Sequence, residues 1–588
     1  MAHSVLIHDA DSSQWLLFEH PRQIHTTHNR YEVIPILQQI EREVESGYHA
    51  AGFISYEASP AFDAALKTHP LNEFPALWFG LYDPPKRLTM DEFVALQSRQ
   101  SYFHGRWTPN VSRPDFDEAI ARIKHYIVQG DTFQVNYSFR LHTSFHGDAF
   151  SFFLDLMEAK PGQYGAFIDL GAIAICSASP ELFFSLSGTH LRSKPMKGTA
   201  ARGGSTEGDR QQATALRQSI KDRAENVMVV DMIRNDMGRI AHVGSVRVPS
   251  LFETERYPTV WQMTSTVTAE TSASWVDILR ALFPCASITG APKPRTMEII
   301  TQLESSPRNL YTGTIGYLAP QRQAQFNVAI RTVLIDSRTH IAEYGVGSGI
   351  VWDSDSQREY DECHVKMLVL GDTRSAQMSQ RPPNFSLLET IRWTPHEGYF
   401  LMPYHLQRLQ NSADYFGIPV QTDAIQHALA NLSQQLARIP HKVRLRVDQD
   451  GRWRLESTPW IRPTHGPVRL RLASQAIDST DPFLYHKTTH RQVYDEARAG
   501  CSDCDDVLLW NESGHVTESC IANLVVQIGH KQYTPPICCG LLAGTFRAWL
   551  LEQHKIEERV ISREDLYRVD RLYLINSVRG WQEATLQL

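Results

Sequence analysis

Hydrophobic and polar residues follow two different periods in the first 370 residues of the chain. A period of two runs through residues 163–170 and 182–186, which is typical of half-buried strands. A period near 3.6 runs through residues 208–240 and 355–370 and predicts long helices. Strands interleaved with long helices predict an α+β fold for this part of the chain.

The last 200 residues show the same mixture in shorter elements. Residues 386–393 and 399–402 predict a pair of strands around a turn at 395–398. A helix is predicted at 405–416, directly after the second strand. No period of fixed length repeats along the chain, which excludes a solenoid.

The length of 588 residues implies more than one domain, because single hydrophobic cores stop growing at about 250–300 residues. Residues 371–384 lack aliphatic anchors and include the pair Pro382-Pro383, which is typical of a solvated linker. We therefore expect an α+β multidomain protein with a first domain at 1–370, a linker at 371–384 and a second domain at 385–588.

Composition and charge exclude several classes of protein. Hydrophobic residues at 42% and charged residues at 21% are ordinary for a globular protein. The net charge of -7 disfavours a nucleic-acid partner, which requires a basic face. The chain shows no signal peptide and no apolar run near the ~20 residues that span a bilayer. We expect a cytoplasmic enzyme with no membrane and no nucleic-acid partner.

The eight cysteines do not form the framework of a small disulfide-rich protein, because the chain is long. Cys501, Cys504, Cys538 and Cys539 could supply four thiolates to a zinc ion. Their flanking residues are typical of the start of a strand and of a helix, so we expect no zinc site.

Two pairs of carboxylates lie on predicted helices at a spacing of three residues. Asp222 and Glu225 form one pair and Glu359 and Glu362 the other, so each pair shares a helix face. Two such faces turned toward each other would suit Mg²⁺, which accepts a few carboxylates and leaves positions for water and an anionic substrate. Taken alone, each pair is better explained as a solvated acidic face.

Seven motifs change this interpretation because they occur in a characteristic order. They lie at residues 179–183, 195–199, 224–236, 287–293, 327–331, 347–349 and 359–363. In this order the first domain resembles the chorismate-utilising enzymes, a family that includes anthranilate, isochorismate and salicylate synthases and aminodeoxychorismate synthase component I. The resemblance implies a chorismate-binding sandwich of antiparallel sheets covered by helices.

The resemblance also implies roles for individual residues. Glu225 and Glu362 would hold Mg²⁺, and Asp222 and Glu359 would act through its waters. The remaining positions would bind the two carboxylates of chorismate: Ser287, Gly347 and Gly349 the ring carboxylate, and Tyr311 and Arg331 the enolpyruvyl carboxylate, which suits a bidentate arginine.

Lys197 distinguishes between members of the family. Anthranilate synthases have a small residue at this position, whereas aminodeoxychorismate synthases have a lysine whose amine attacks the ring. A neutral amine is needed, so we expect burial or a cation such as Lys194 to depress its pKa. Glu181 would protonate the departing hydroxyl, which requires a raised pKa. Residues 260–262 read Val-Trp-Gln where many relatives have a histidine at the third position.

The second domain resembles the fold-type IV pyridoxal-phosphate enzymes through motifs at 404–409, 486–491, 516–523, 540–545 and 576–579. The resemblance implies that Lys487 binds the cofactor as an imine and that Glu518 faces the pyridine nitrogen. Arg408, Ser577, Gly544 and Thr545 would bind the phosphate, the last two at a helix N-terminus. Arg491 or Arg579 would bind substrate carboxylate. Each residue alone also fits an ordinary surface or capping position.

Together the two resemblances imply synthesis of 4-aminobenzoate from chorismate, with Mg²⁺ and pyridoxal phosphate as cofactors. The chain has no glutaminase motif, so a separate glutamine amidotransferase subunit would supply ammonia, and the second domain suggests a homodimer. One alternative is an anthranilate or salicylate synthase fused to an aminotransferase. Another is a degenerate scaffold, although the presence of Lys197, Glu181, Glu225, Glu362 and Lys487 disfavours it.

Overall fold

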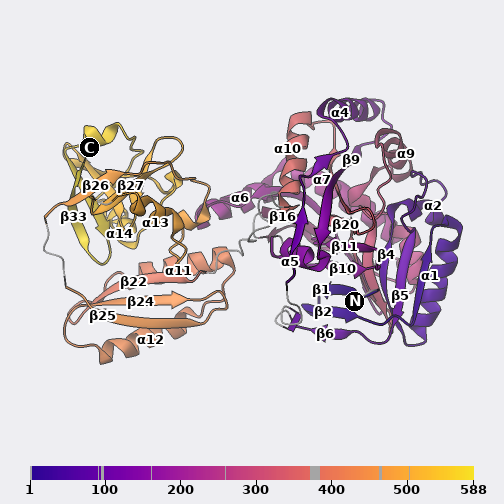
Figure 1. The fold of residues 1–588 in the computed structure, drawn as a ribbon, viewed down its shortest axis with the longest axis horizontal. Coiled ribbons are helices and arrows are strands. Elements are labelled where there is room, and N and C mark those ends of the chain that lie inside the picture. Colours follow the sequence, from indigo (N-terminus) through magenta and orange to yellow (C-terminus); the bar gives the residue numbers. More distant parts are fainter. Residues whose placement is uncertain are drawn as a thin grey trace. The chain divides into compact units, whose positions relative to one another are not determined.

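The computed structural model describes residues 3–89, 92–93, 99–159, 162–257, 260–370, 385–461, 466–501 and 503–587. The chain divides into two compact units (Figure 1). The first comprises Met1–Ala200 and Ala215–Pro382, and the second comprises Ala201–Thr214 and Pro383–Leu588. The segment predicted to be a linker, residues 371–384, lies outside the described residues.

Two large antiparallel sheets form the first unit. One runs in the order β17 (Gly290–Ala291), β9 (Gln134–Gly147), β21 (Ile341–Ile350), β20 (Thr332–Asp336), β11 (Ile173–Ser177), β10 (Ala166–Asp169), β1 (Val5–Asp9), β2 (Gln14–Phe18) and β6 (Lys86–Leu88), with β7 (Tyr102–His104) and β8 (Thr108–Pro109) beside β9. The other runs in the order β14 (Met196–Ala201), β16 (Val260–Glu270), β13 (His190–Lys194), β12 (Leu182–Ser187), β19 (Gln323–Val328), β18 (Thr314–Ala319), β4 (His49–Ile54), β5 (Leu77–Tyr82) and β3 (Gln23–Thr27), with β15 (Arg247–Arg256) beside β16.

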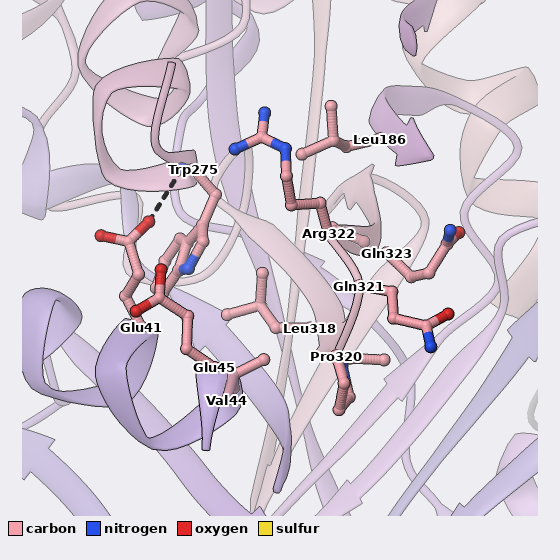
Figure 2. A pocket seen from close by; sticks show the side chains of 12 residues that line it. Glu41, Val44, Glu45, Leu186, Trp275, Leu318, Pro320, Gln321, Arg322 and Gln323 are labelled. Atoms are coloured by element: carbon pink, nitrogen blue, oxygen red, sulfur yellow. Dashed lines mark hydrogen bonds between the residues drawn. The ribbon is translucent and has the colours of Figure 1, made fainter. Parts of the chain in front are cut away.

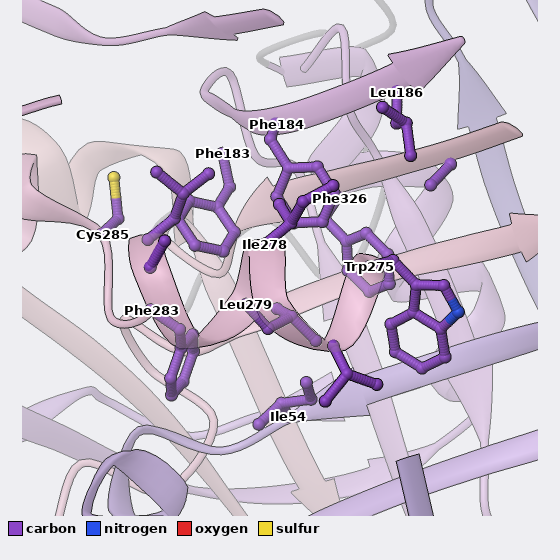
Figure 3. Packing of buried hydrophobic residues seen from close by; sticks show 14 of the residues in the cluster. Ile54, Phe183, Phe184, Leu186, Trp275, Ile278, Leu279, Phe283, Cys285 and Phe326 are labelled. Atoms are coloured by element: carbon purple, nitrogen blue, oxygen red, sulfur yellow. The ribbon is translucent and has the colours of Figure 1, made fainter. Parts of the chain in front are cut away.

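The sheets form a sandwich because alternate residues of their strands are apolar. Val5 and Phe18 of the first sheet share a core with Phe53 and Trp78 of the second. The outer faces carry apolar residues as well, and helices cover them. Figure 3 shows this on the second sheet, where Phe184 and Phe326 lie close to residues of α8 (Trp275–Leu282). The predicted sandwich of antiparallel sheets with helices is confirmed.

The helices of the first unit pack on these outer faces. Besides α8 they are α1 (Arg30–Glu45), α2 (Ser59–Phe62), α4 (Arg113–Val128), α5 (Ala149–Ala159), α7 (Ile220–Gly238), α9 (Lys293–Leu303) and α10 (Ser356–Met367). The pattern over 208–240 predicts one helical stretch, but the structure has two helices there, α6 (Thr206–Gln218) and α7. Ser219 separates them, because its side chain accepts a hydrogen bond from the Asp222 N–H and caps α7.

The second unit has a small and a large sheet. The small sheet runs in the order β23 (Gly398–Tyr399), β22 (Leu387–Thr394), β24 (His441–Val447) and β25 (Trp453–Pro459), and it packs with α11 (Met402–Phe416) and α12 (Thr422–Gln435). The predicted strand pair is present, with Trp393 opposite Tyr399. Its second strand is shorter than predicted, because Leu401 adopts a left-handed conformation and α11 begins at Met402.

The large sheet is mixed rather than purely antiparallel. It runs in the order β28 (Val516–Ser519), β27 (Asp506–Trp510), β26 (Val468–Leu472), β33 (Gly580–Leu586), β32 (Arg571–Asn576), β29 (Asn523–Ile528), β30 (Lys531–Thr534) and β31 (Glu557–Glu558), with β26 parallel to both its neighbours. Helices α13 (Gln492–Ala499) and α14 (Thr545–Glu552) belong to this part. Of the helices that the structure describes, none is long and apolar enough to cross a bilayer.

Candidate active sites

Lys197 lies on β14, at one edge of the second sheet. Gly198 follows with a φ of +97°, a conformation that side-chain-bearing residues rarely adopt. A Cβ at Gly198 would also lie 3.0 Å from the Cβ of Asp222, so the glycine lets β14 approach the first turn of α7. The predicted helper Lys194 forms an ion pair with Glu255.

Glu181 lies beside Lys197 in a buried position. Its side chain is 3% exposed, and the Ser287 hydroxyl donates a hydrogen bond to its Oε1 at 2.6 Å. Burial raises the pKa of Glu181 to about 7, although Ser287 and the charges of Lys197 and Arg331 lower it. A carboxyl group with this pKa holds a proton for about half of the time at neutral pH, as a general acid requires.

The four predicted carboxylates come from α7 and α10, and Glu225 interacts electrostatically with Asp222 and Glu359. Burial raises the pKa of Glu225, and the charges of Asp222 and Glu359 add to this shift. Burial also opposes ionisation of Glu362, but the ammonium group of Lys366, 2.7 Å away, lowers its pKa below the ordinary value. Among the described residues no three His, Cys, Asp or Glu side chains form a ready metal-binding cluster.

These carboxylates nevertheless fit a divalent cation by their chemistry. Glu225 is largely buried, its nearest ion-pair partner is Lys221 at 3.9 Å, and the charges of Lys197 and Lys221 lower its pKa only in part. A cation with two positive charges would stabilise the ionised form of Glu225, which burial and, less strongly, Asp222 and Glu359 now disfavour. Glu225 and Glu362, with Asp222 and Glu359 nearby, could therefore hold Mg²⁺.

Tyr311 lies near the charge of Lys366, and Arg331 lies near that of Glu181. The Tyr311 ring lies flat against Gly345, where an added Cβ would be 2.2 Å from the ring. Arg331 has a left-handed backbone with a φ of +50°, and burial lowers the pKa of its guanidinium group. The charge of Arg331 acts on Glu181, so the arginine predicted to bind a carboxylate lies close to the glutamate predicted to be the acid.

Lys366 and Gln134 are two site residues that the sequence analysis did not predict. Lys366 donates to the Gly347 carbonyl at 2.8 Å, and it lies one helical turn after Glu362, a spacing that could have indicated an i,i+4 ion pair. Gln134 is 1% exposed, and neither its amide nitrogen nor its amide oxygen has a hydrogen-bond partner among the described residues. Polar atoms buried in this way are uncommon in proteins and call for a water or a ligand as partner.

Gly349 keeps space open between these groups. A Cβ at this position would lie 2.9 Å from the Nζ of Lys197 and 3.1 Å from the Nε2 of Gln134. Gly347 faces the opposite strand, and a Cβ there would lie 2.3 Å from the Tyr137 carbonyl oxygen. Gly349 therefore leaves room for the lysine amine, whereas Gly347 allows close packing against β9.

Gln262, the residue that departs from the histidine of many relatives, contacts the strand of Lys197. Its Nε2 donates to the Gly198 carbonyl at 2.9 Å, and its Oε1 accepts from the Thr199 hydroxyl at 3.1 Å. The side chain is 7% exposed. Gln262 thus fixes the backbone on the carboxyl side of Lys197.

A second site lies around Lys487 in the second unit. The Leu388 N–H of β22 donates to the Lys487 carbonyl at 2.9 Å, which anchors the backbone of the lysine. Burial lowers the pKa of the Lys487 ammonium to about 8, and the charge of Arg408 adds to this effect. A lysine with this pKa is available as a neutral amine at mildly alkaline pH.

Glu518 on β28 faces the same site. Its Oε1 accepts from the Tyr494 hydroxyl at 2.8 Å and from the Leu542 N–H at 3.0 Å, and its Oε2 accepts from the Asn523 amide at 3.0 Å. Burial nevertheless raises the pKa of Glu518 to about 7. The group is thus held rigidly and would gain from a positively charged partner such as a protonated pyridine nitrogen.

Arg408 on α11 is held by a carboxylate that the sequence analysis missed. Glu389 accepts from Arg408 Nε at 2.9 Å and from Arg408 Nη2 at 2.7 Å, and it bonds His405 Nδ1 at 2.6 Å. Burial opposes ionisation of Glu389, but the charges of Arg408 and His405 lower its pKa to about 2. His405 Nε2 lies 3.3 Å from the Thr545 hydroxyl. Predicted phosphate-binding residues are therefore joined by one buried network.

The remaining predicted residues lie at the ends of nearby elements. Gly544 is the N-cap of α14, and a Cβ there would lie 1.8 Å from the Asn523 side-chain oxygen. Ser577 follows the last residue of β32 and is 7% exposed. Arg491 donates to the Cys520 carbonyl and stacks over the Tyr494 ring. In the described part of the chain, no contact connects the Arg579 side chain with Lys487.

The four cysteines considered for zinc do not form a common site. Cys501 and Cys504 are joined by a disulfide, while Cys538 and Cys539 are free thiols in a short helical turn. The expectation that they bind no zinc stays a prediction. The disulfide itself was not predicted.

A pocket elsewhere in the first unit contains none of the predicted residues (Figure 2). It lies beside α1 and α8 and is lined by Val44, Leu318 and Trp275 among others. Glu41 accepts a hydrogen bond from the backbone N–H of Trp275 at 3.0 Å, shown as a dashed line in Figure 2. The candidate catalytic groups gather around Lys197 and Lys487 instead.

Two family models match separate parts of the chain. Residues 5–371 match the family model of chorismate binding enzymes, and residues 386–586 match that of class IV amino-transferases. Since the first match covers more than half of the chain, the chain belongs to the family of chorismate binding enzymes. Its second part is a class IV amino-transferase domain.

Three similar proteins illustrate the relationship. Aminodeoxychorismate synthase component 1 of Salmonella typhimurium is 36% identical over 370 residues, which cover 58% of this chain and 80% of that protein. The component 1 protein of Escherichia coli is 41% identical over 263 residues, 44% of this chain and 58% of its own length. Anthranilate synthase component I from Streptococcus pneumoniae shares the fold, with a TM-score of 0.53 and 24% identity over 63% of this chain and 92% of its own.

Proposed function

We propose that the chain makes 4-aminobenzoate from chorismate in two steps, amination to 4-amino-4-deoxychorismate and elimination of pyruvate. The observation that carries the proposal is the position of Lys197. Its amine approaches Gly349 and Gln134 and interacts with Glu181, whose pKa of about 7 suits an acid at neutral pH. Similarity to aminodeoxychorismate synthase component 1 proteins supports the same assignment.

In the first step the neutral amine of Lys197 attacks C2 of the chorismate ring, and the double bond shifts as the 4-hydroxyl departs. Glu181 gives its proton to that hydroxyl, which leaves as water. Ammonia then adds at C4, the double bond returns, and the lysine amine is expelled. Ser287, through its bond to Glu181, keeps the acid directed into the site.

Other residues of the first unit bind and orient the substrate. Arg331 and Tyr311 would bind the enolpyruvyl carboxylate, and Ser287 with the Gly347 and Gly349 amides the ring carboxylate. Glu225 and Glu362 would hold Mg²⁺, with Asp222 and Glu359 bonding to its waters, and the ion would supply positive charge to the ring carboxylate. Lys366 and Gln134 are added to this set, because Lys366 bonds to Gly347 and pairs with Glu362 while the Gln134 amide lies beside Gly349.

In the second step Lys487 removes the proton from C4 of the ring. A pKa of about 8 lets the lysine act as a base near pH 8. Pyridoxal phosphate, when bound, supplies the electron sink for this proton removal. Glu518 would face the pyridine nitrogen, while Arg408, Gly544, Thr545 and Ser577 would bind the phosphate. Pyruvate leaves from C3 and the ring becomes aromatic.

The proposal also includes the source of ammonia. A separate glutamine amidotransferase subunit would deliver it, which agrees with the designation of the relatives as component 1. We further propose that the chain forms a homodimer through its class IV amino-transferase domain.

The test is product identification after the purified chain is incubated with chorismate, Mg²⁺, pyridoxal phosphate and ammonium at mildly alkaline pH. Chromatography should show 4-aminobenzoate and pyruvate in equal amounts. Lys86→Ala and Lys531→Ala are controls for replacement of Lys197 and Lys487. They change exposed lysines paired with Glu19 and Glu557 and should not alter the products. Anthranilate or salicylate would instead support a different synthase fused to an aminotransferase, and no turnover by a folded chain would support a scaffold.

A further inference from the structure

Residues 201–214, here called the docking segment, belong to the second unit although both their sequence neighbours belong to the first. The segment begins directly after Ala200 on the strand of Lys197. After it, the chain continues into α7, which carries Asp222 and Glu225. One continuous stretch of about 30 residues therefore contains the predicted nucleophile, the docking segment and two predicted metal ligands.

Arg202 connects the docking segment with α11. Its Nη2 donates to the Tyr415 carbonyl at 3.1 Å, and its guanidinium group lies 4.4 Å from the centre of the Tyr415 ring. Its Nε donates to Asp209 Oδ1 at 2.6 Å, and both side chains of this pair are 7% exposed. A buried pair with well-aligned hydrogen bonds favours one arrangement of the segment.

Two further contacts place the docking segment against the same helix and the residues before Lys487. The Thr206 hydroxyl donates to the Asn411 carbonyl at 3.1 Å. Gly204 lies directly on the Tyr485 ring, where an added Cβ would be 2.6 Å from a ring carbon. Such a close approach requires glycine.

His486 connects the docking segment with Lys487, which is the next residue in the chain. Its ring lies 4.3 Å from that of Tyr415, and its Nδ1 is 3.0 Å from the Ser412 hydroxyl. The His486 ring also interacts with the backbone of Gly204. The ring is 4% exposed, and burial lowers its pKa to about 4, so it packs as a neutral group.

We propose that the docking segment positions the lysine site of the second unit: by holding α11 and His486, it fixes the positions of Arg408 and Lys487. Arg408 lies on α11 two turns before Tyr415, and Lys487 follows His486 in sequence. Arg202 is thus a positioning residue for the cofactor site. In sequence it directly follows the strand that carries Lys197. The part of this proposal that concerns the cofactor rests on the proposed function.

The test compares full-length Arg202→Ala and Arg202→Lys with Arg217→Ala, which changes an exposed arginine of α6 outside the docking segment. Affinity for pyridoxal phosphate is measured from its visible absorbance, and that absorbance is also titrated with pH. Arg202→Ala should weaken cofactor binding about tenfold and shift the titration midpoint, because a buried charged hydrogen-bonding group is lost. Arg202→Lys should restore part of the affinity, since lysine keeps the charge without the fork.

Hydrogen exchange provides a readout that needs no cofactor. Exchange in residues 405–416 and 484–489 should increase in Arg202→Ala and stay at the wild-type level in Arg217→Ala. Thr206→Val, which removes only the hydroxyl bond to Asn411, should give a smaller change in the same direction and serves if Arg202→Ala does not fold.

The positioning role would be overturned if both Arg202→Ala and Thr206→Val kept the wild-type cofactor affinity, the wild-type pH titration of the absorbance and the wild-type hydrogen exchange. Failure of the proposed function would look different. The wild-type chain would then show no lysine-bound cofactor absorbance, while the exchange difference between Arg202→Ala and Arg217→Ala would still decide whether the segment holds α11 and His486.

Discussion

The Ser287 hydroxyl donates a hydrogen bond to Glu181 Oε1 at 2.6 Å, and both side chains are 3% exposed. The bond favours the ionised carboxylate, whereas burial favours the protonated one. Burial has the larger effect, since the pKa of Glu181 is about 7 rather than its ordinary value near 4.5. These two opposing effects therefore set the pKa of Glu181 near the pH at which the enzyme would work.

Replacing Ser287 should change the pH dependence of the first step. Glu181 must be protonated to act as an acid, so the rate should fall as the pH rises through about 7. Ser287→Ala removes a bond to the ionised form, which raises the pKa of Glu181 and moves the falling limb of kcat to higher pH. Chorismate consumption measured across the pH range checks this, with the exposed Ser272→Ala as control. A limb that stays in place would contradict the assignment of Glu181 as the acid.

Gly349→Ala should block the first step and spare the second. The added Cβ would lie 2.9 Å from the Nζ of Lys197 and would displace the amine. Because a displacement of about 1 Å can lower a rate ~100-fold, amination should fall by at least that order. Gly238→Ala places a Cβ in open space and is the matched control. Normal amination by Gly349→Ala, measured with ammonium as the nitrogen source, would show that the lysine amine does not act at this position.

Gln262→Ala should slow amination without a comparable change in KM for chorismate. The variant leaves the Gly198 carbonyl and the Thr199 hydroxyl without their partner beside Lys197. Loss of two hydrogen bonds of ~1 kcal/mol each predicts a fall in kcat of about tenfold or more. Steady-state kinetics test this, with Gln323→Ala, which changes an exposed glutamine, as control. An unchanged kcat would show that β14 needs no support from Gln262.

Glu389→Gln should destabilise the second unit and weaken binding of the cofactor phosphate. The folded-state pKa of Glu389, about 2, lies below its ordinary value near 4.5. Its ionisation therefore stabilises the fold above pH ~4.5, and this contribution is lost as the pH falls toward 2. At pH 7 the variant should lose on the order of 3 kcal/mol of unfolding free energy, because Arg408 keeps a buried charge.

Urea unfolding of wild type and Glu389→Gln at pH 7 and near pH 3 measures this effect. The difference between the two proteins should shrink at the lower pH. Glu397→Gln, which changes a carboxylate 62% exposed and 3.5 Å from Arg392, should have little effect at either pH. A difference that grows on acidification would contradict the direction of the pKa shift.

Much of the fold could be predicted from local patterns, because strand and helix periods are local properties of the sequence. The break at Ser219 was missed, since the apolar period continues across it although Ser219 caps α7. The motifs pointed to Lys197, Glu181 and Lys487, which the structure places among groups of charged residues. Their catalytic roles stay predictions. The motifs could not reveal that Gln134 or Glu389 joins these groups, because both arrive from distant strands and match no motif.

The docking segment was also beyond sequence analysis. A hydrophobic pattern indicates which face of α6 is buried, but not which unit buries it. The contact of Gly204 with Tyr485 joins residues about 280 positions apart, and only the tertiary structure brings them together.

The central claim is that Lys197 and Lys487 perform two successive steps in one chain, and half-reactions of the two lysine variants test it most directly. Lys487→Ala, given chorismate, Mg²⁺ and ammonium, should release 4-amino-4-deoxychorismate and no 4-aminobenzoate. Lys197→Ala, supplied with pyridoxal phosphate, should form none from chorismate but should convert that released intermediate to 4-aminobenzoate and pyruvate. Formation of 4-aminobenzoate from chorismate by either variant alone would contradict the account.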